Sequence, residues 1–199
     1  MNKTFLRTAQ IAFVTLLFSF ATTKVLTPTW NIDTSHSKIS FEVNHFFTPV
    51  EGFFNEYKGE LTFDAADLEG SSVNFTVQVA SVKTDSEKRD KHLQSADFFD
   101  AKKFPEMKFT STSITKIGNG YTAKGNLTIR DVTKTVEVPF KVLGKGSHPM
   151  KKGVEIIAIK AGFKINRNDY GVGTGSWAAT AVVGDEVTIK IVIEGNRKI

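Results

Sequence analysis

The sequence contains no cysteine among its 199 residues. Disulfides, thiolate metal sites, iron–sulfur clusters and a cysteine nucleophile are therefore excluded. The polar aromatic residues are also few, with 3 Tyr and 2 Trp against 17 Phe. Because phenylalanine carries no polar group, this excess predicts a large apolar surface that makes no hydrogen bonds.

Charge of one sign never dominates a segment of the chain. The 26 Lys and Arg and the 21 Asp and Glu are interspersed, and no five consecutive residues carry the same charge. This pattern excludes a disordered basic tail, and we expect no nucleic-acid partner. The length predicts a single domain that can bury its own core.

The N-terminal segment has the layout of a secretory signal peptide. Lys3 and Arg7 precede an apolar stretch of 12 residues, Ala9 to Phe20, and Ser19-Phe20-Ala21 provides small residues at a cleavage site. The stretch is shorter than the roughly 20 residues that span a bilayer. We predict a signal peptide over 1–21 and one mature domain over 22–199, and we expect no stable membrane span. A retained membrane anchor is the alternative.

Most of the remaining chain alternates between apolar and polar residues, as strands with one buried face do. The alternation predicts eight strands, near 37–46, 52–63, 72–82, 106–117, 120–130, 134–144, 153–165 and 185–195. Gly118-Asn119-Gly120 is a strong hairpin signal between two of them. A charged stretch, Asp85 to Gln94, predicts a short helix between the third and fourth strands.

Long antiparallel strands with one apolar face avoid exposed edges by closing into a barrel. We therefore predict an all-β fold, an eight-stranded antiparallel barrel of the lipocalin-like kind with the short helical insertion. A sandwich is the competing fold. A membrane barrel is disfavoured because the polar faces carry charged residues such as Lys38, Glu42 and Glu194.

No catalytic signature is recognisable. The pattern Gly-x-Ser-x-Gly is missing, and the glycines of 171–175 lack both the spacing and the setting of a phosphate-binding loop. The carboxylates form no pair that spacing would bring together. We predict no enzymatic activity and no cofactor. A lipid-modifying enzyme that uses His45 with Ser37 or Ser81 is the alternative.

Two histidines and a nearby carboxylate are the candidates for a metal site. His36 and His45 with Asp33 could begin one, but their odd spacing places the two rings on opposite faces of an ideal strand. We predict no metal. His45 is either a core residue or a contact for a ligand head group. Arg167 either bridges a strand end to the following loop or contributes to a polar rim at the barrel mouth.

The chain resembles the YceI-like family of secreted polyisoprenoid-binding proteins. The resemblance rests on the order and spacing of short blocks: Trp30-Asn31-Ile32-Asp33, His36-Ser37, Phe41-Glu42-Val43, Arg89-Asp90-Lys91-His92-Leu93, Asp97-Phe98-Phe99-Asp100, Gly125-Asn126-Leu127-Thr128-Ile129 and Arg167-Asn168-Asp169-Tyr170-Gly171. Asp131 departs from the family's usual glycine, and the loop 171–180 varies in length within the family.

The resemblance implies a lipocalin-like barrel in the periplasm that binds a long-chain isoprenoid, of the quinone or polyprenyl phosphate type, without catalysis. A stress-related structural barrel without ligand is a further alternative, and a homodimer is left open. From the apolar faces of the strands we predict that the ligand contacts Phe41, Val43, His45, Phe53, Tyr57, Phe75, Val77, Phe109, Tyr121, Leu127 and Phe140. Arg167, as a polar rim residue at the mouth, is the twelfth predicted contact.

Overall fold

The computed structural model of the 199-residue chain describes residues 26–179 and 181–199. The predicted signal peptide, 1–21, lies outside the described residues. The strands and helices are β1 (Thr29–His45), β2 (Thr48–Phe54), β3 (Tyr57–Asp64), β4 (Asp67–Gln78), η1 (Val79–Ser81), β5 (Val82–Lys83), α1 (Glu87–Gln94), β6 (Glu106–Ile117), β7 (Gly120–Ile129), β8 (Val132–Ser147), β9 (Val154–Asn166), η2 (Arg167–Tyr170), η3 (Gly175–Trp177) and β10 (Val183–Lys198).

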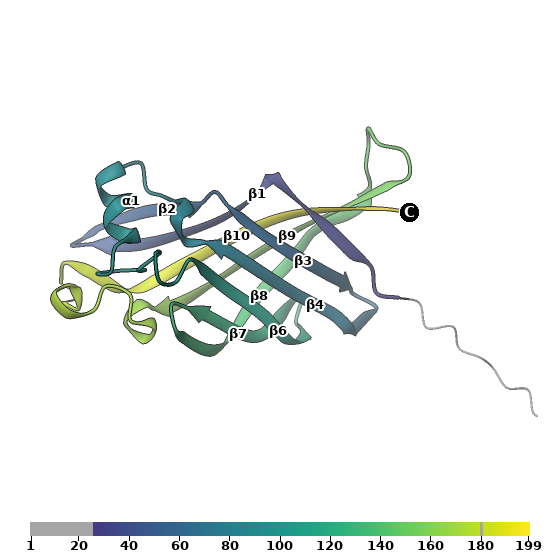
Figure 1. The fold of residues 1–199 in the computed structure, drawn as a ribbon. Coiled ribbons are helices and arrows are strands. Elements are labelled where there is room, and N and C mark those ends of the chain that lie inside the picture. The colour runs from purple at the N-terminus through teal and green to yellow at the C-terminus, as the bar shows by residue number, and fades with distance from the viewer. Residues whose placement is uncertain (1–25, 180) are drawn as a thin grey trace, which may run out of the picture.

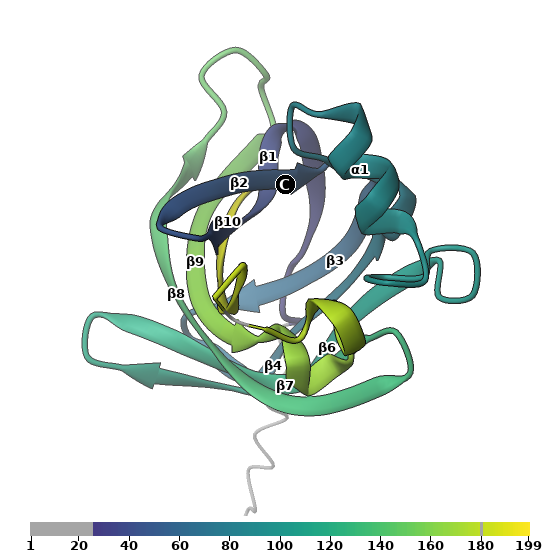
Figure 2. The same cartoon turned by 90° about the vertical axis from the view of Figure 1, so that its left-hand side faces the viewer.

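The strands form a closed antiparallel barrel, which confirms the predicted fold (Figures 1 and 2). Eight strands make the ring in the order β10-β9-β8-β7-β6-β4-β3-β1, and a β10–β1 pairing closes it. That last pairing runs the length of β1, from Asn31 opposite Asn196 to His45 opposite Val183. The short strands β2 and β5 lie outside this ring. β2 pairs with the C-terminal half of β1, and β5 pairs with β2.

The two ends of the barrel are built differently. The β1–β2 hairpin, α1 and residues 166–179 and 181–183 gather at one end, which we call the rim end (Figure 1). The hairpins at 64–67, 117–120 and 147–154 lie at the opposite end, together with the start of β1; we call this the closed end. Figure 2 views the ring of strands from the rim end.

The predicted strand over 52–63 is two strands, and this corrects one face assignment. β2 ends at Phe54 and β3 begins at Tyr57. Between them the Asn55 amide donates to the Ser81 carbonyl (3.2 Å), and the Glu56 carbonyl accepts from the Gln78 amide (2.9 Å). Since successive side chains alternate faces, this interruption changes the parity of the inward positions. Phe54 points inward, and Phe53 does not.

Sequence signals also mark the boundaries of β6, β7 and α1. β6 and β7 meet at the predicted Gly118-Asn119-Gly120 turn, where Gly118 adopts a left-handed φ of 57°. Ser86 caps α1 by accepting a hydrogen bond from the Arg89 amide, as serine does at helix starts. The predicted helical insertion between the third and fourth predicted strands is confirmed as α1.

Candidate ligand-binding cavity

The barrel encloses an apolar cavity of about 230 Å³. Its wall is built from the inward faces of β1 to β4 and β6 to β10, and Leu93, Phe98 and Phe99 cover it from the α1 side. Beyond the cavity, a tightly packed core that includes Trp30, Phe63 and Ile157 fills the closed end. The lining residues nearest the rim end, among them Val43 and Val183, are only half-buried. The cavity therefore opens toward the rim end.

Three phenylalanine rings of the wall each lie across a glycine of the neighbouring strand. An added Cβ at Gly52 would stand 2.4 Å from the Phe41 ring, one at Gly59 2.5 Å from the Phe75 ring, and one at Gly125 2.7 Å from the Phe109 ring. Glycine lets a ring lie flat against the sheet because no side chain occupies that position. These pairs hold large rings against the wall and leave the interior open.

Most of the sequence-predicted ligand residues line this cavity. Those that do are Phe41, Val43, Phe75, Val77, Phe109, Leu127, Phe140 and Arg167. Each apolar member lies on the inward side of its strand's alternation. Whether they touch a ligand stays a prediction.

Phe53 and His45 do not line the cavity, and the predicted interior position of each needs correction: Phe53 for its face, His45 for its place at the strand end. Phe53 lies on the outer face, where the Lys38 ammonium sits 4.7 Å from its ring centre. The strand break after Phe54 is the physical reason. His45 follows the parity of β1 correctly, but it lies at the last residue of the strand and is exposed at the rim, with its ring 4.5 Å from that of Phe46. The alternation could not show that the barrel wall ends before it.

Tyr57 and Tyr121 point inward but lie away from the cavity. Tyr57 is opposite Val77 and packs at the edge of the core, where burial raises the pKa of its hydroxyl. Tyr121 belongs to the closed end, stacked on Phe140 with ring centres 5.3 Å apart. Neither residue is among those that line the cavity. Inward-facing residues thus line the cavity in one part of the barrel and fill the packed core in another. Sequence periodicity does not distinguish the two.

Arg167 lines the cavity, but its donors are committed to the protein backbone. It is 4% exposed, and its Nε donates to the Gly184 carbonyl (2.8 Å). Both Nη atoms donate to carbonyls of the following loop: Val172 (2.9 Å), Gly173, Trp177 (2.8 Å) and Val183 (2.8 Å). The five N–H groups of a guanidinium are all used in this way. The geometry supports the bridging role that the sequence left open, and not a contact to a ligand head group.

Other lining residues were missed as ligand contacts. Phe54 and Ile39 face the lumen on β2 and β1, and Ile189, Ile191 and Ile193 do so on β10. The alternation of 185–195 already marked the β10 residues as an apolar face. Phe98, Phe99, Tyr170 and Val172 come from non-strand segments, where no period of two exists to identify them.

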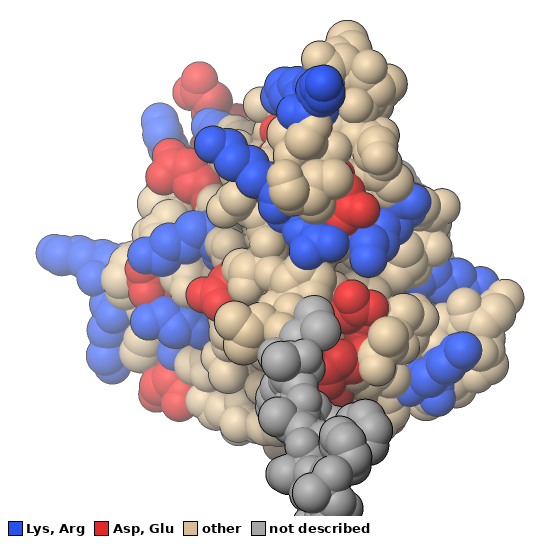
Figure 3. All heavy atoms as spheres, turned by 90° about the vertical axis from the view of Figure 1, so that its right-hand side faces the viewer, with Lys and Arg blue, Asp and Glu red and all other residues tan. Residues whose placement is uncertain are grey.

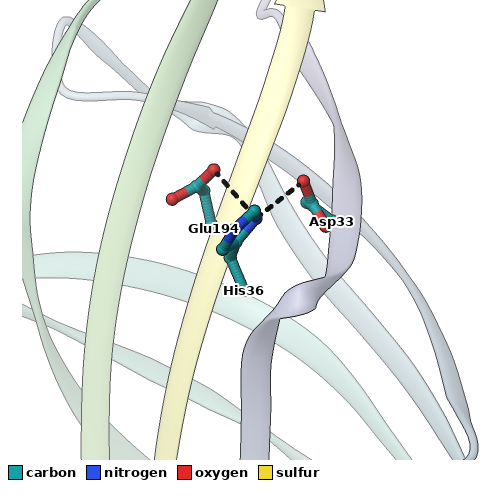
Figure 4. A group of neighbouring side chains, drawn as sticks. All are labelled: Asp33, His36 and Glu194. Carbon is teal, nitrogen blue, oxygen red and sulfur yellow. Dashed lines mark hydrogen bonds and ion pairs between the residues drawn. The ribbon is translucent and has the colours of Figure 1, made fainter.

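The one group within residues 26–179 and 181–199 with a metal-ligand composition is Asp33, His36 and Glu194 (Figure 4). Asp33 and Glu194 are direct cross-strand neighbours, and like charges so placed repel. The His36 Nδ1 lies 3.1 Å from Asp33 and 3.8 Å from Glu194. The hydrogen bond to Asp33 raises the pKa of His36 and lowers that of Asp33. The imidazolium thus relieves the repulsion between two surface carboxylates.

The fold and cavity together define a class: closed eight-stranded antiparallel barrels with two extra strands, one short helix and an apolar interior. The sequence matches the YceI-like domain over residues 30–195, and the chain belongs to that family. It is 34% identical over 186 residues to Protein YceI of Salmonella agona, covering 92% of this chain and 93% of that protein. It is 37% identical over 163 residues to a UPF0312 protein of Serratia proteamaculans, covering 81% and 82%.

Solved structures show the same architecture. BcnA of Burkholderia cenocepacia superposes with a TM-score of 0.75 at 32% identity, covering 82% of this chain and 99% of that one. A polyisoprenoid-binding domain from Saccharophagus degradans gives 0.61 at 12% identity, covering 83% and 97%. At that identity the second likeness bears on the fold alone. Within the described residues, no helix has the length and apolarity needed to cross a membrane.

Proposed function

We propose that the protein binds a long-chain isoprenoid lipid, of the quinone or polyprenyl phosphate type, and carries it in the barrel. The observation that carries this proposal is the apolar cavity of about 230 Å³ whose phenylalanine rings lie flat over glycines. Membership of the YceI-like family supports it, and so does the likeness in fold to the polyisoprenoid-binding domain of Saccharophagus degradans.

Hydrophobic burial supplies the binding energy in this proposal. Each methylene transferred from water to an apolar site gains about 0.8 kcal/mol, so an apolar chain binds without a specific polar contact. Ligand pockets for drug-sized molecules usually span about 300–1,000 Å³. At about 230 Å³ the cavity holds only part of a long chain. The remainder and the head group must extend through the mouth at the rim end.

A carrier role fits the geometry better than catalysis. His45 stands at the exposed rim hairpin. The Ser37 hydroxyl donates to the Glu194 carbonyl (3.4 Å), and the Ser81 hydroxyl donates to the Gln78 carbonyl (2.7 Å). The enzyme alternative needs one of these hydroxyls beside that imidazole, so it loses its support. The open cavity likewise disfavours a filled structural barrel. The signal-peptide pattern of 1–21 supports export to the periplasm as part of the proposal.

Native mass spectrometry of gently purified protein tests the function. We expect a co-purified lipid, or uptake of a quinone or polyprenol at one molecule per chain. A second readout is Phe109→Trp, whose fluorescence should change on titration with a quinone while the fold stays stable. Ligand-free protein that takes up neither lipid, together with a destabilised and unresponsive Phe109→Trp variant, would overturn the proposal.

A further inference from the structure

The β1–β2 hairpin presents two adjacent phenylalanines to water. Phe46 is 55% exposed and Phe47 is 98% exposed. Phe46 also adopts a left-handed φ of 52°, which is uncommon for a bulky residue. Its amide donates to the Val182 carbonyl at 2.9 Å, so the hairpin is tied to the segment that precedes β10. The backbone holds both rings outward at the rim end.

This hairpin and the segment that precedes β10 carry no charged residues. Residues 43–50, 170–179 and 181–184 contain no Asp, Glu, Lys or Arg, although 24% of the chain is charged. The Phe46–Val182 hydrogen bond joins the two segments, and we call them together the uncharged rim. It also carries Trp177, which is half-buried against Phe98 and His92. Tryptophan and phenylalanine on an uncharged surface are typical of proteins that lie at a membrane interface.

The five carboxylates that flank the uncharged rim in sequence are paired. Lys190 binds Glu42 (2.6 Å) and Glu51 (3.4 Å), Lys164 binds Glu186 (2.6 Å), and Lys134 binds Asp169 (2.8 Å). The side-chain amide of Asn166 donates a hydrogen bond to the Asp185 carboxylate at 2.9 Å. Phosphate head groups that approach the rim therefore meet no unpaired carboxylate among these flanking residues.

The uncharged rim is continuous with the cavity. Val43 and Val183 belong to both, and they lie on the two strands that close the barrel. We propose that the uncharged rim docks onto a lipid bilayer, with Phe46 and Phe47 inserted among the acyl chains, so that an apolar chain passes from bilayer to cavity without crossing water. This inference rests on the proposed function for the identity of the cargo, and the docking itself is measured without cargo.

The closed end supplies the matched control. Ile117 and Met150 are 61% and 86% exposed there. Unlike the rim residues, they stand among exposed lysines, including Lys116, Lys151 and Lys152. Figure 3 views the molecule from this end and shows Lys and Arg spread over it. Substitutions at the two ends remove similar apolar surface but differ in their surroundings.

Flotation with phosphatidylcholine vesicles, which carry no net charge, tests the docking. We expect the double variant Phe46→Ser, Phe47→Ser to bind at least about tenfold more weakly than the parent protein. The double variant Ile117→Ser, Met150→Ser should bind like the parent. Binding should persist at high salt, because it does not depend on exposed charges. Phe47→Trp should be quenched by doxyl-labelled lipid, and Ile117→Trp should not.

Three results would overturn the docking proposal. The first is equal binding by the two double variants. The second is binding that requires anionic lipid and disappears with salt, which would point to the lysines of the closed end. The third is a rim variant that changes a dimer to a monomer in sedimentation without changing vesicle binding, which would show that a second copy covers the rim.

Delivery of a quinone by two routes separates this inference from the proposed function. The rim variant should take up quinone from a dilute solution as the parent does, and at least about tenfold more slowly from vesicles. Equal uptake from vesicles by both proteins would overturn the docking and leave the function intact. No uptake by the parent from either source, with vesicle binding still dependent on the two phenylalanines, would overturn the function and leave the docking intact.

Discussion

The two ends of the barrel use the same residue type to opposite effect. At the closed end Phe63 meets the rings of Tyr121 and Phe140 edge-on, with ring centres 5.1 and 5.6 Å apart. On the cavity wall the rings of Phe41 and Phe75 lie over Gly52 and Gly59. The rings of Phe63, Tyr121 and Phe140 pack against one another across the closed end and fill it, whereas those of Phe41 and Phe75 lie along the wall beside glycines. Ring packing across the barrel and the room that a neighbouring glycine leaves thus separate the filled end from the cavity.

The ends also differ in what holds them together. Trp30 is 1% exposed at the closed end, and its indole donates to the Phe63 carbonyl at 3.0 Å, so apolar packing dominates there. At the rim end two arginines bind loop carbonyls. The buried Arg167 holds the carbonyls of residues 172, 173, 177, 183 and 184, and the half-buried Arg130 donates to the carbonyls of Phe98 (2.9 Å) and Gly171. Directed hydrogen bonds thus order loops around a mouth that dense packing would obstruct.

The largest expected effect is a loss of stability from a substitution at the closed end. Phe63→Ala should lower the free energy of unfolding by about 3–5 kcal/mol, because it removes a buried ring and leaves a void. Phe75→Ala should lower it by only about 1–2 kcal/mol, since that ring already borders empty space. Urea denaturation of both variants checks the difference. Equal losses would mean that the cavity wall is packed like the core.

Arg167→Met should have the next largest effect. It removes all the guanidinium donors and leaves several buried carbonyls unpaired, which we expect to lower the free energy of unfolding by about 2–4 kcal/mol. Amide exchange over 171–183 should accelerate, while exchange in β6 and β7 should change little. Arg167→Lys is the control, and it should restore only part of the protection because a single ammonium reaches fewer carbonyls. Unchanged exchange would contradict the bridging role.

Gly59→Ala should act on the cavity with a smaller effect on stability. The new Cβ would stand 2.5 Å from Cε1 of Phe75, so the ring must swing toward the lumen. Overpacking of this kind costs about 1–3 kcal/mol. Isoprenoid affinity should fall while the barrel stays folded. Gly162→Ala is the matched control, because its Cβ would meet only the Ile189 carbonyl at 3.4 Å. Full affinity in Gly59→Ala would show that Phe75 does not bound the lumen.

The smallest effect concerns the surface between the ends, at His36. Hydrogen bonding to Asp33 raises the pKa of His36, with further attraction from Asp33 and Glu194, and lowers that of Asp33. The contribution of His36 to stability is present below its ordinary pKa of about 6.5 and is lost as the pH rises through its raised value. The contribution of Asp33 is lost as the pH falls through its lowered value. Titration by NMR should show the raised pKa of His36, and Glu194→Gln should lower it. An unshifted His36 would contradict the arrangement.

Local sequence features determined most of the strands. The alternation predicted β6 over 106–117 and all of β7, with one residue too many at its end, because each strand exposes one face and buries the other whatever its partners are. Gly118-Asn119-Gly120 placed their turn, since a tight hairpin needs residues that tolerate positive φ. Seven of the twelve predicted ligand residues are apolar side chains that line the cavity for this same local reason.

Only the tertiary structure decided where the interior is open and where it is filled. The break at Asn55 and Glu56 depends on hydrogen bonds to Ser81 and Gln78, more than 20 residues away, and it turned Phe53 outward. Tyr121 and Phe109 share an inward pattern, but one meets rings and the other a glycine. Periodicity reports which face of a strand is apolar. It does not report how rings from distant strands pack across the barrel or where a nearby glycine leaves room for a ring, and in this barrel those contacts decide whether a phenylalanine fills the interior or leaves room for a ligand.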